Sequence, residues 1–206
     1  MCAGPPLVGR TTMGRRSSRG YSLIELTFVT GLVATLSGIA VPQVLTALDD
    51  YRTAGAVHYL ATRLGRARME AAARSADVAL RFTPDADGDS FAVYVDGNGD
   101  GVRTRDIQQG TDRLLLPAEH LRDNFSGVAF AVPSGLPPVD SGPATDGDPL
   151  KLGSSNLLSF SALGTSSSGS VYIRGRSGAQ YVIRTYGQTG KVRTLKYDAR
   201  SRRWNP

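Results

Sequence analysis

Apolar residues dominate the chain from Tyr21 to Val41. These 21 residues include one charged side chain, Glu25. About 20 apolar residues at 1.5 Å per residue are enough to cross a hydrocarbon core about 30 Å thick. The pattern therefore predicts a membrane-spanning helix over residues 21–42. A cleaved secretory signal fits less well, because its apolar stretch is shorter and ends at a small-residue cleavage site.

After Pro42 the apolar pattern changes to a helical spacing. Between Gln43 and Thr83 there is no proline, and apolar side chains recur every three or four residues. This stripe is typical of an amphipathic helix and consists of Val57, Leu60, Leu64, Ala67 and Ala71. Joined through Pro42, residues 21 to about 75 are predicted to form one long helix, whose second half needs a sheet to cover its stripe.

Short β-rich segments follow, separated by turns rich in Gly, Asp and Pro. They are residues 77–82, 90–95, 114–116, 128–132, 157–162, 170–174, 179–186 and 191–197. The last three are expected to form an antiparallel meander, because Gly-containing turns join them. Residues 133–149 hold five prolines and three glycines and are predicted to form a long exposed loop. A long helix packed on an antiparallel sheet is an α+β fold, with residues 43–206 as its globular domain.

Charge is distributed unevenly along the 206 residues, which carry a net charge of +6. Residues 1–20 hold four arginines and no acid, residues 84–150 hold four bases and twelve acids, and residues 171–206 hold nine bases and one acid. The arginines ahead of the apolar segment place residues 1–20 in the cytoplasm and the globular domain on the other side of the membrane. A single cysteine, Cys2, excludes an intrachain disulfide and a cysteine-based zinc site.

Glu25 needs a partner, because a carboxylate inside a spanning helix costs about 2.5–3.5 kcal/mol. It either reaches back to the membrane interface or meets a positive group on a neighbouring subunit. Its surroundings match a known signal: the run from Arg19 to Leu26, Arg-Gly-Tyr-Ser-Leu-Ile-Glu-Leu, resembles the class III signal of type IV pilins and type II secretion pseudopilins.

That resemblance implies a cleaved basic leader over residues 1–20, with Met13 as an alternative start to Met1. A prepilin peptidase would cut between Gly20 and Tyr21, and Tyr21 would then be N-methylated. Glu25 would neutralise the terminal ammonium of an adjacent subunit during filament assembly. Pro42 resembles the family's proline at which the helix kinks as it leaves the membrane.

The carboxy-terminal pattern is similar to that of the GspH/FimT family. Phe160, the run over residues 164–169, a hairpin, and residues 190–193 (Gly-Lys-Val-Arg) carry this resemblance. It implies an H-type minor pseudopilin of a type II secretion system, single-pass in the inner membrane, that helps export folded proteins across the outer membrane. Its partners would be the other pseudopilins, the inner-membrane assembly platform and the prepilin peptidase, which also methylates.

A FimT-type minor pilin that binds DNA in natural transformation is the alternative. Residues 190–193 resemble a Gly-Arg-x-Arg motif in which lysine replaces the first arginine, so Lys191 and Arg193 are the candidate DNA contacts. Nearby bases alternate with Tyr197 and Trp204, a mixture suited to phosphates and stacked bases. The other interpretation is a solvated strand edge guarded by charges.

Two further motifs concern metal binding and catalysis. Asp96, Asn98 and Asp100, followed by glycine, imitate the start of a calcium loop, with Asp106 one residue short of the usual bidentate position. A solvated turn has the same composition. The sequence contains no H-x-x-x-H, G-x-S-x-G or phosphate-loop motif, so we expect no enzyme activity and no cofactor other than this candidate calcium ion.

Overall fold

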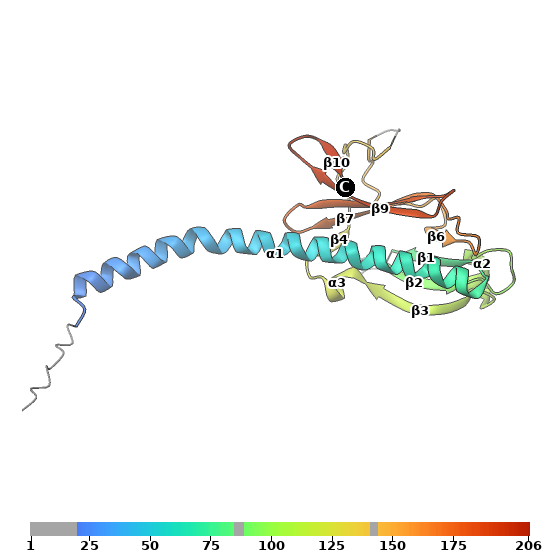
Figure 1. Ribbon diagram of the computed structural model, residues 1–206, viewed down its shortest axis with the longest axis horizontal. Coiled ribbons are helices and arrows are strands. Elements are labelled where there is room, and N and C mark those ends of the chain that lie inside the picture. The colour runs from blue at the N-terminus through green and yellow to red at the C-terminus, as the bar shows by residue number, and fades with distance from the viewer. Residues whose placement is uncertain (1–19, 85–88, 141–143) are drawn as a thin grey trace, which may run out of the picture. The chain divides into compact units, whose positions relative to one another are not determined.

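The computed structural model describes residues 20–84, 89–140 and 144–206 (Figure 1). The chain separates into two units, residues 1–43 and 44–206. The predicted leader, apart from Gly20, lies outside the described residues. The strands all belong to the second unit.

One helix, α1 (Leu23–Arg74), contains both the apolar and the amphipathic segments. Pro42 lies inside α1, and the helix continues on both sides of it, so the kink there stays a prediction. Beyond Pro42 the predicted apolar stripe is confirmed: Val57, Leu60, Leu64, Ala67 and Ala71 are all buried. The helix ends where Ser75 adopts a left-handed conformation (φ 52°) and the Ala76 amide donates to the Ala71 carbonyl, which is the Schellman arrangement.

The first of two antiparallel sheets has the strand order β3-β2-β1-β6. Its strands are β1 (Val78–Thr83), β2 (Ser90–Val95), β3 (Arg113–His120) and β6 (Leu157–Phe160). β1 and β2 pair continuously from Val78↔Val95 to Thr83↔Ser90. β3 is an edge strand and contains Pro117, which has no amide to donate to a further strand.

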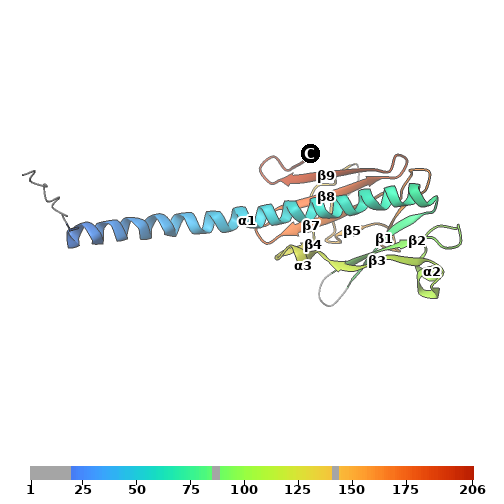
Figure 2. The same ribbon diagram turned by 60° about the horizontal axis from the view of Figure 1, so that its bottom comes forward.

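The second sheet has the order β10-β9-β8-β7-β4, and a short β5 also pairs with β7. Its strands are β4 (Val128–Phe130), β5 (Leu150–Lys151), β7 (Gly169–Gly175), β8 (Gln180–Tyr186), β9 (Lys191–Asp198) and β10 (Arg203–Asn205). The predicted meander of β7, β8 and β9 is confirmed. The sequence predicted one sheet, whereas the structure has two (Figure 2). The two sheets are linked just beyond β6, where the Ser166 amide donates to the carbonyl of Gly187, the residue after β8.

Several elements were not predicted. They are α2 (Thr104–Gln109), α3 (Leu121–Asn124), β5 and β10. All are two to six residues long, too short for a periodic pattern to develop.

The prediction that residues 133–149 form an exposed loop is wrong in part. The segment has no helix or strand among its described residues, but Thr145 is buried and its backbone bonds to Gly135 and Leu136. The segment therefore folds back on itself rather than extending into solvent.

Two clusters of buried side chains hold the second unit together. The larger cluster combines the α1 stripe with both sheets, and Phe82 packs edge-on against Phe130 with ring centroids 5.6 Å apart. The smaller cluster lies on the far face of the second sheet, where Tyr172, Val182 and Leu195 are covered partly by residues 132–139 and by Trp204.

A polar clamp fastens α1 to the edge strand β3. The Tyr59 hydroxyl donates to one oxygen of Glu119 at 2.6 Å, and Arg63 contacts the other oxygen at 2.5 Å. The Arg63 guanidinium also lies 5.0 Å from the centre of the Tyr59 ring. Burial and the hydrogen bond to Glu119 raise the pKa of Tyr59, so the phenol remains a donor.

Candidate functional site

The predicted processing site lies immediately ahead of α1. Gly20, Tyr21 and Ser22 precede the first helical residue, and Tyr21 is 85% exposed. Within the described residues the Gly20–Tyr21 peptide bond therefore lies outside a helix and is exposed. Glu25 follows in the first turn, where its negative charge is favourable beside the unpaired helix amides.

Residues 20–48 bury none of their side chains within the described parts of the chain. Large apolar groups line the helix all round, among them Leu23, Phe28 and Ile39 at 80%, 73% and 61% exposure. Among the residues that the structure describes, α1 is the one helix long and apolar enough to cross a membrane. So large an apolar surface is stable in lipid or against other apolar helices.

The polar groups of this apolar segment are mostly satisfied within the helix. The hydroxyls of Thr27, Thr30 and Thr35 each donate to a carbonyl three or four residues earlier, at 2.8–3.0 Å. Glu25 differs from them: within residues 20–84, 89–140 and 144–206 its carboxylate has neither a hydrogen bond nor an ion pair. In lipid such a group requires an external partner.

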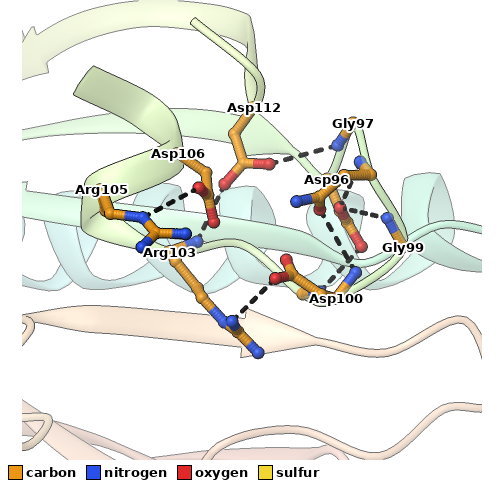
Figure 3. A network of polar contacts seen from close by, with 10 residues as sticks. Asp96, Gly97, Gly99, Asp100, Arg103, Arg105, Asp106 and Asp112 are labelled. Atoms are coloured by element: carbon orange, nitrogen blue, oxygen red, sulfur yellow. Dashed lines mark hydrogen bonds and ion pairs between the residues drawn. The ribbon is translucent and has the colours of Figure 1, made fainter. Parts of the chain in front are cut away.

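In the candidate calcium loop, carboxylates accept hydrogen bonds from the backbone amides of the loop itself (Figure 3). Asp96 accepts from the amides of Asn98, Gly99 and Gly101 at 2.9–3.0 Å. Burial of the Asp96 side chain opposes ionisation, but these three amides and Arg103 outweigh it and lower its pKa. Asp96 therefore holds the turn in shape as an anion.

The other predicted metal ligands are not gathered around one point. Asp100 pairs with Arg103 at 2.7 Å, while Asp106 is buried in α2, 3.6 Å from Arg105. Asn98 accepts from the Asp100 amide. Within the part of the chain that the structure describes, no three acidic, histidine or cysteine side chains are placed to hold a metal ion. Calcium binding at this loop stays a prediction.

Sequence reasoning missed Asp112, which completes the same loop. Its buried carboxylate accepts from the amides of Gly97 and Arg103 at 3.2 and 2.9 Å, across 15 and 9 residues. Gly97 allows this closure, because a Cβ there would lie 1.9 Å from the Thr111 carbonyl oxygen. No local pattern pairs Asp112 with Gly97, so the sequence held no signal for this contact.

Lys191 and Arg193 are exposed at the start of β9 and two residues apart, so they share one face of the strand. Arg193 lies opposite Arg184 on β8, whose charge is neutralised by Asp140 at 2.8 Å. Lys191 lies opposite Tyr186. The structure therefore brings the two candidate DNA contacts together on an accessible face.

The two aromatic residues of the tail, Tyr197 and Trp204, contact each other and are half-buried. Trp204 packs against Tyr172 and Tyr197 with centroids 5.9 and 5.2 Å apart, and its indole nitrogen donates to the Pro137 carbonyl. Trp204 is half-buried and packs against the smaller core cluster, and its role as a base-stacking group stays a prediction.

Catalytic groups do not converge in the described structure. His58 is exposed on α1, and His120 ends β3, 3.6 Å from Asp123. In the serine run, Ser166 donates to the Tyr186 carbonyl and Ser168 accepts from the Gly187 amide. These serines connect the two sheets.

The sequence is 40% identical over 84 residues to the pilin-like protein PilA1 of Thermus thermophilus. The aligned region covers 39% of this chain and 49% of PilA1, so the match spans about half the length of that relative. No known protein family and no solved structure matches the chain. The similarity supports a type IV pilin-like protein. A long apolar helix followed by antiparallel sheets confirms the predicted pilin-like α+β fold.

Proposed function

We propose that this chain is a membrane-anchored subunit of a type IV pilin-like filament and, within that class, an H-type minor pseudopilin of a type II secretion system. The observation that carries the proposal is Glu25 in the first turn of α1, a carboxylate without a partner among the described residues, at the start of an apolar segment that is exposed over residues 20–48. One such charge is costly in lipid and becomes favourable when a cation from another subunit meets it.

The cation follows from processing. Cleavage between Gly20 and Tyr21 creates a terminal ammonium four residues ahead of Glu25. Methylation of that nitrogen keeps its positive charge. In the low dielectric of a helix bundle, a carboxylate and an ammonium from neighbouring subunits attract strongly, which offsets much of their desolvation. The pair would set the axial register of each incoming subunit, because every other side chain of this segment is uncharged.

The role is structural rather than enzymatic. The other pseudopilins and the inner-membrane assembly platform would be its partners, with the globular domain on the periplasmic side. The similarity to PilA1 supports a pilin-related role. The assignment to a secretion system and to the inner membrane rests on the sequence resemblance described above.

The test of assembly compares Glu25→Gln with Glu70→Gln, a matched change on the same helix where Glu70 is an exposed partner of Arg74. Each variant is expressed with a prepilin peptidase and the other pseudopilins. Both should be cleaved to an N-methylated Tyr21, as mass spectrometry would show, and both should stay in the membrane. Glu25→Gln alone should lose cross-linking to other pseudopilins. Equal cross-linking by both variants would contradict the proposal.

A FimT-type minor pilin is the second candidate, favoured by the exposed pair Lys191 and Arg193 on one face of β9. Deleting the gene separates the two candidates. If the chain is a pseudopilin, the deletion should abolish protein export and leave DNA uptake unchanged. If it is a DNA-binding pilin, the deletion should abolish DNA uptake and leave protein export unchanged. In the second case Lys191→Gln/Arg193→Gln should also weaken binding to duplex DNA, and the binding should fall steeply with salt.

A further inference from the structure

The bases of the carboxy-terminal region separate into two groups at opposite ends of β9. Lys191 and Arg193 lie near the turn at Thr189, whose carbonyl accepts from Arg68 in the second half of α1. The other group follows Asp198, in the β9–β10 hairpin. Eight strand residues at about 3.3 Å each separate the two ends by roughly 25 Å. They are therefore separate surfaces.

The β9–β10 hairpin lies at the end of the second unit where that unit begins. Lys196 of β9 and Tyr181 of β8 border a surface hollow whose other side is α1 at Ala47, Asp50, Tyr51 and Ala54. The β7–β8 turn is at the same end, since the Ser177 hydroxyl donates to Asp50 at 2.6 Å. Figures 1 and 2 both show the two hairpins at the end of the sheet beside this part of α1.

That end is tethered to the apolar segment by a very short length of chain. The second unit begins at Val44, two residues after Pro42, where the predicted membrane span ends. Two residues reach at most about 7 Å, whatever the angle between the units. The polar headgroup layer extends roughly 5–8 Å beyond the hydrocarbon on each side. In a chain anchored by residues 21–42, Val44, where the unit begins, therefore lies within the reach of the headgroup layer.

The hairpin carries a dense positive charge, with Asp198 as its one acid. Arg200, Arg202 and Arg203 are exposed, and none of them has an ion pair within the described ranges of the chain. The nearest acid in sequence, Asp198, accepts from the Ser201 hydroxyl at 2.8 Å and from the Arg200 amide at 2.9 Å, which shapes the turn. Lys196 adds a further cation, placed over the ring of Tyr181.

The opposite end of the unit carries a cluster of acids as well as Lys191 and Arg193. Asp77, directly beyond the end of α1, accepts from the Asp96 amide, and the loop after Asp96 contains Asp100, Asp106 and Asp112. The acidic loop is thus remote from the tether, while the unpaired arginines are beside it.

We infer that the hairpin formed by Arg200, Arg202 and Arg203 binds anionic phospholipid headgroups and holds the globular domain against the membrane before assembly. This inference rests on the proposed membrane anchor. Each arginine beside an anionic surface contributes a factor of about five to docking, so two contribute roughly thirty-fold. The attraction falls off within a Debye length and weakens with salt.

Trp204 makes the inference testable, because it is the single tryptophan of the chain and follows Arg203 directly. The full chain is reconstituted in vesicles of phosphatidylcholine, with or without phosphatidylglycerol, that contain a lipid with a nitroxide on its headgroup. Quenching of Trp204 fluorescence then reports contact between the hairpin and the headgroups. We expect stronger quenching with phosphatidylglycerol, and its reversal by high salt.

The matched variants remove two charges from either end of β9. Arg200→Gln/Arg202→Asn removes the hairpin charge, and asparagine suits the left-handed backbone of Arg202 (φ 53°). Lys191→Gln/Arg193→Gln removes the same charge at the far end. The docked-to-undocked ratio should fall roughly thirty-fold in the first variant and stay unchanged in the second. Thermal unfolding of both variants verifies that the hairpin is still folded.

The outcomes separate this inference from the proposed function. Alkaline extraction first shows whether the chain is inserted in the vesicles. Inserted chain whose quenching is independent of phosphatidylglycerol overturns the inference and leaves the anchor intact. Chain that is not inserted overturns both. If Trp204 responds to duplex DNA but not to anionic lipid, the hairpin is a nucleic-acid surface and the lipid inference is wrong.

Discussion

Replacing Glu119 with glutamine tests the clamp that fastens α1 to the edge of the first sheet. The change keeps the shape of the side chain but leaves Arg63 without its anion. The Nε of Arg63 already has no partner within the described residues, so the guanidinium depends on this contact and on Tyr59. The Arg63 and Glu119 side chains are 17% and 23% exposed, between a surface pair and a buried one.

The expected loss follows from that intermediate position. An exposed ion pair contributes below about 1 kcal/mol, whereas breaking a buried pair costs about 3–5 kcal/mol. Glu119→Gln should therefore lower the free energy of unfolding by about 2 kcal/mol. Tyr59→Phe removes the second donor to Glu119, and because both changes act on one carboxylate their effects should be non-additive by at least about 0.5 kcal/mol.

Urea unfolding of the chain in detergent, followed by Trp204 fluorescence, measures these free energies. Glu70→Gln is the control, because it breaks an exposed pair on the same helix and should cost below about 0.5 kcal/mol. If Glu119→Gln and Glu70→Gln unfold at the same urea concentration, the clamp does not stabilise the domain and the reasoning is refuted.

Three further predictions concern stability, each measured by thermal or urea unfolding. Backbone amides depress the pKa of Asp96 in the folded state, so its contribution is complete above the ordinary value near 4 and is lost as pH falls below it; Asp96→Asn should destabilise the chain by about 1–2 kcal/mol at pH 7, and a difference that persisted at low pH would contradict this. A Cβ on Gly175 would lie 1.9 Å from Thr53 Oγ1, so Gly175→Ala should lower the free energy of unfolding by about 1–3 kcal/mol. Thr53→Ala should restore part of that loss. A Gly175→Ala variant as stable as the parent would show that α1 can shift away from the added methyl group at no cost. Gly65 lies on α1 with no atom within 4 Å of an added Cβ, so Gly65→Ala should raise the free energy of unfolding by about 0.5–1 kcal/mol. A lower free energy of unfolding would contradict this prediction.

Some of the candidate site could be recognised from sequence because its signals are local. The apolar segment, the basic residues before it and Glu25 lie within about 40 consecutive residues and need no fold to be read. Their processing and assembly roles stay predictions, since a single chain shows neither the peptidase nor the neighbouring subunit.

The calcium loop and the basic tail show where local reading was insufficient. Asp96 and Asp100 have the spacing of metal ligands, and calcium binding stays a prediction; in the fold Asp96 accepts from backbone amides of its own turn and Asp100 pairs with Arg103. Trp204 looks like a free stacking group in sequence, yet in the fold it is half-buried and packs against the smaller core cluster together with residues 132–139. In both cases the partner comes from a turn or a distant segment whose position only the folded chain fixes.

The sequence by itself determined the elements whose pattern is long or periodic. The helix from Leu23 to Arg74 and its buried stripe follow from 3.6-residue periodicity, and the meander of β7, β8 and β9 follows from alternation and glycine turns. Tertiary structure alone decided that β6 joins β1, that Glu119 meets α1, and that the carboxy-terminal bases separate to opposite ends of β9. Those outcomes depend on contacts between residues far apart in the chain. The packing of the whole core determines which of these contacts form, so no short stretch of sequence predicts them.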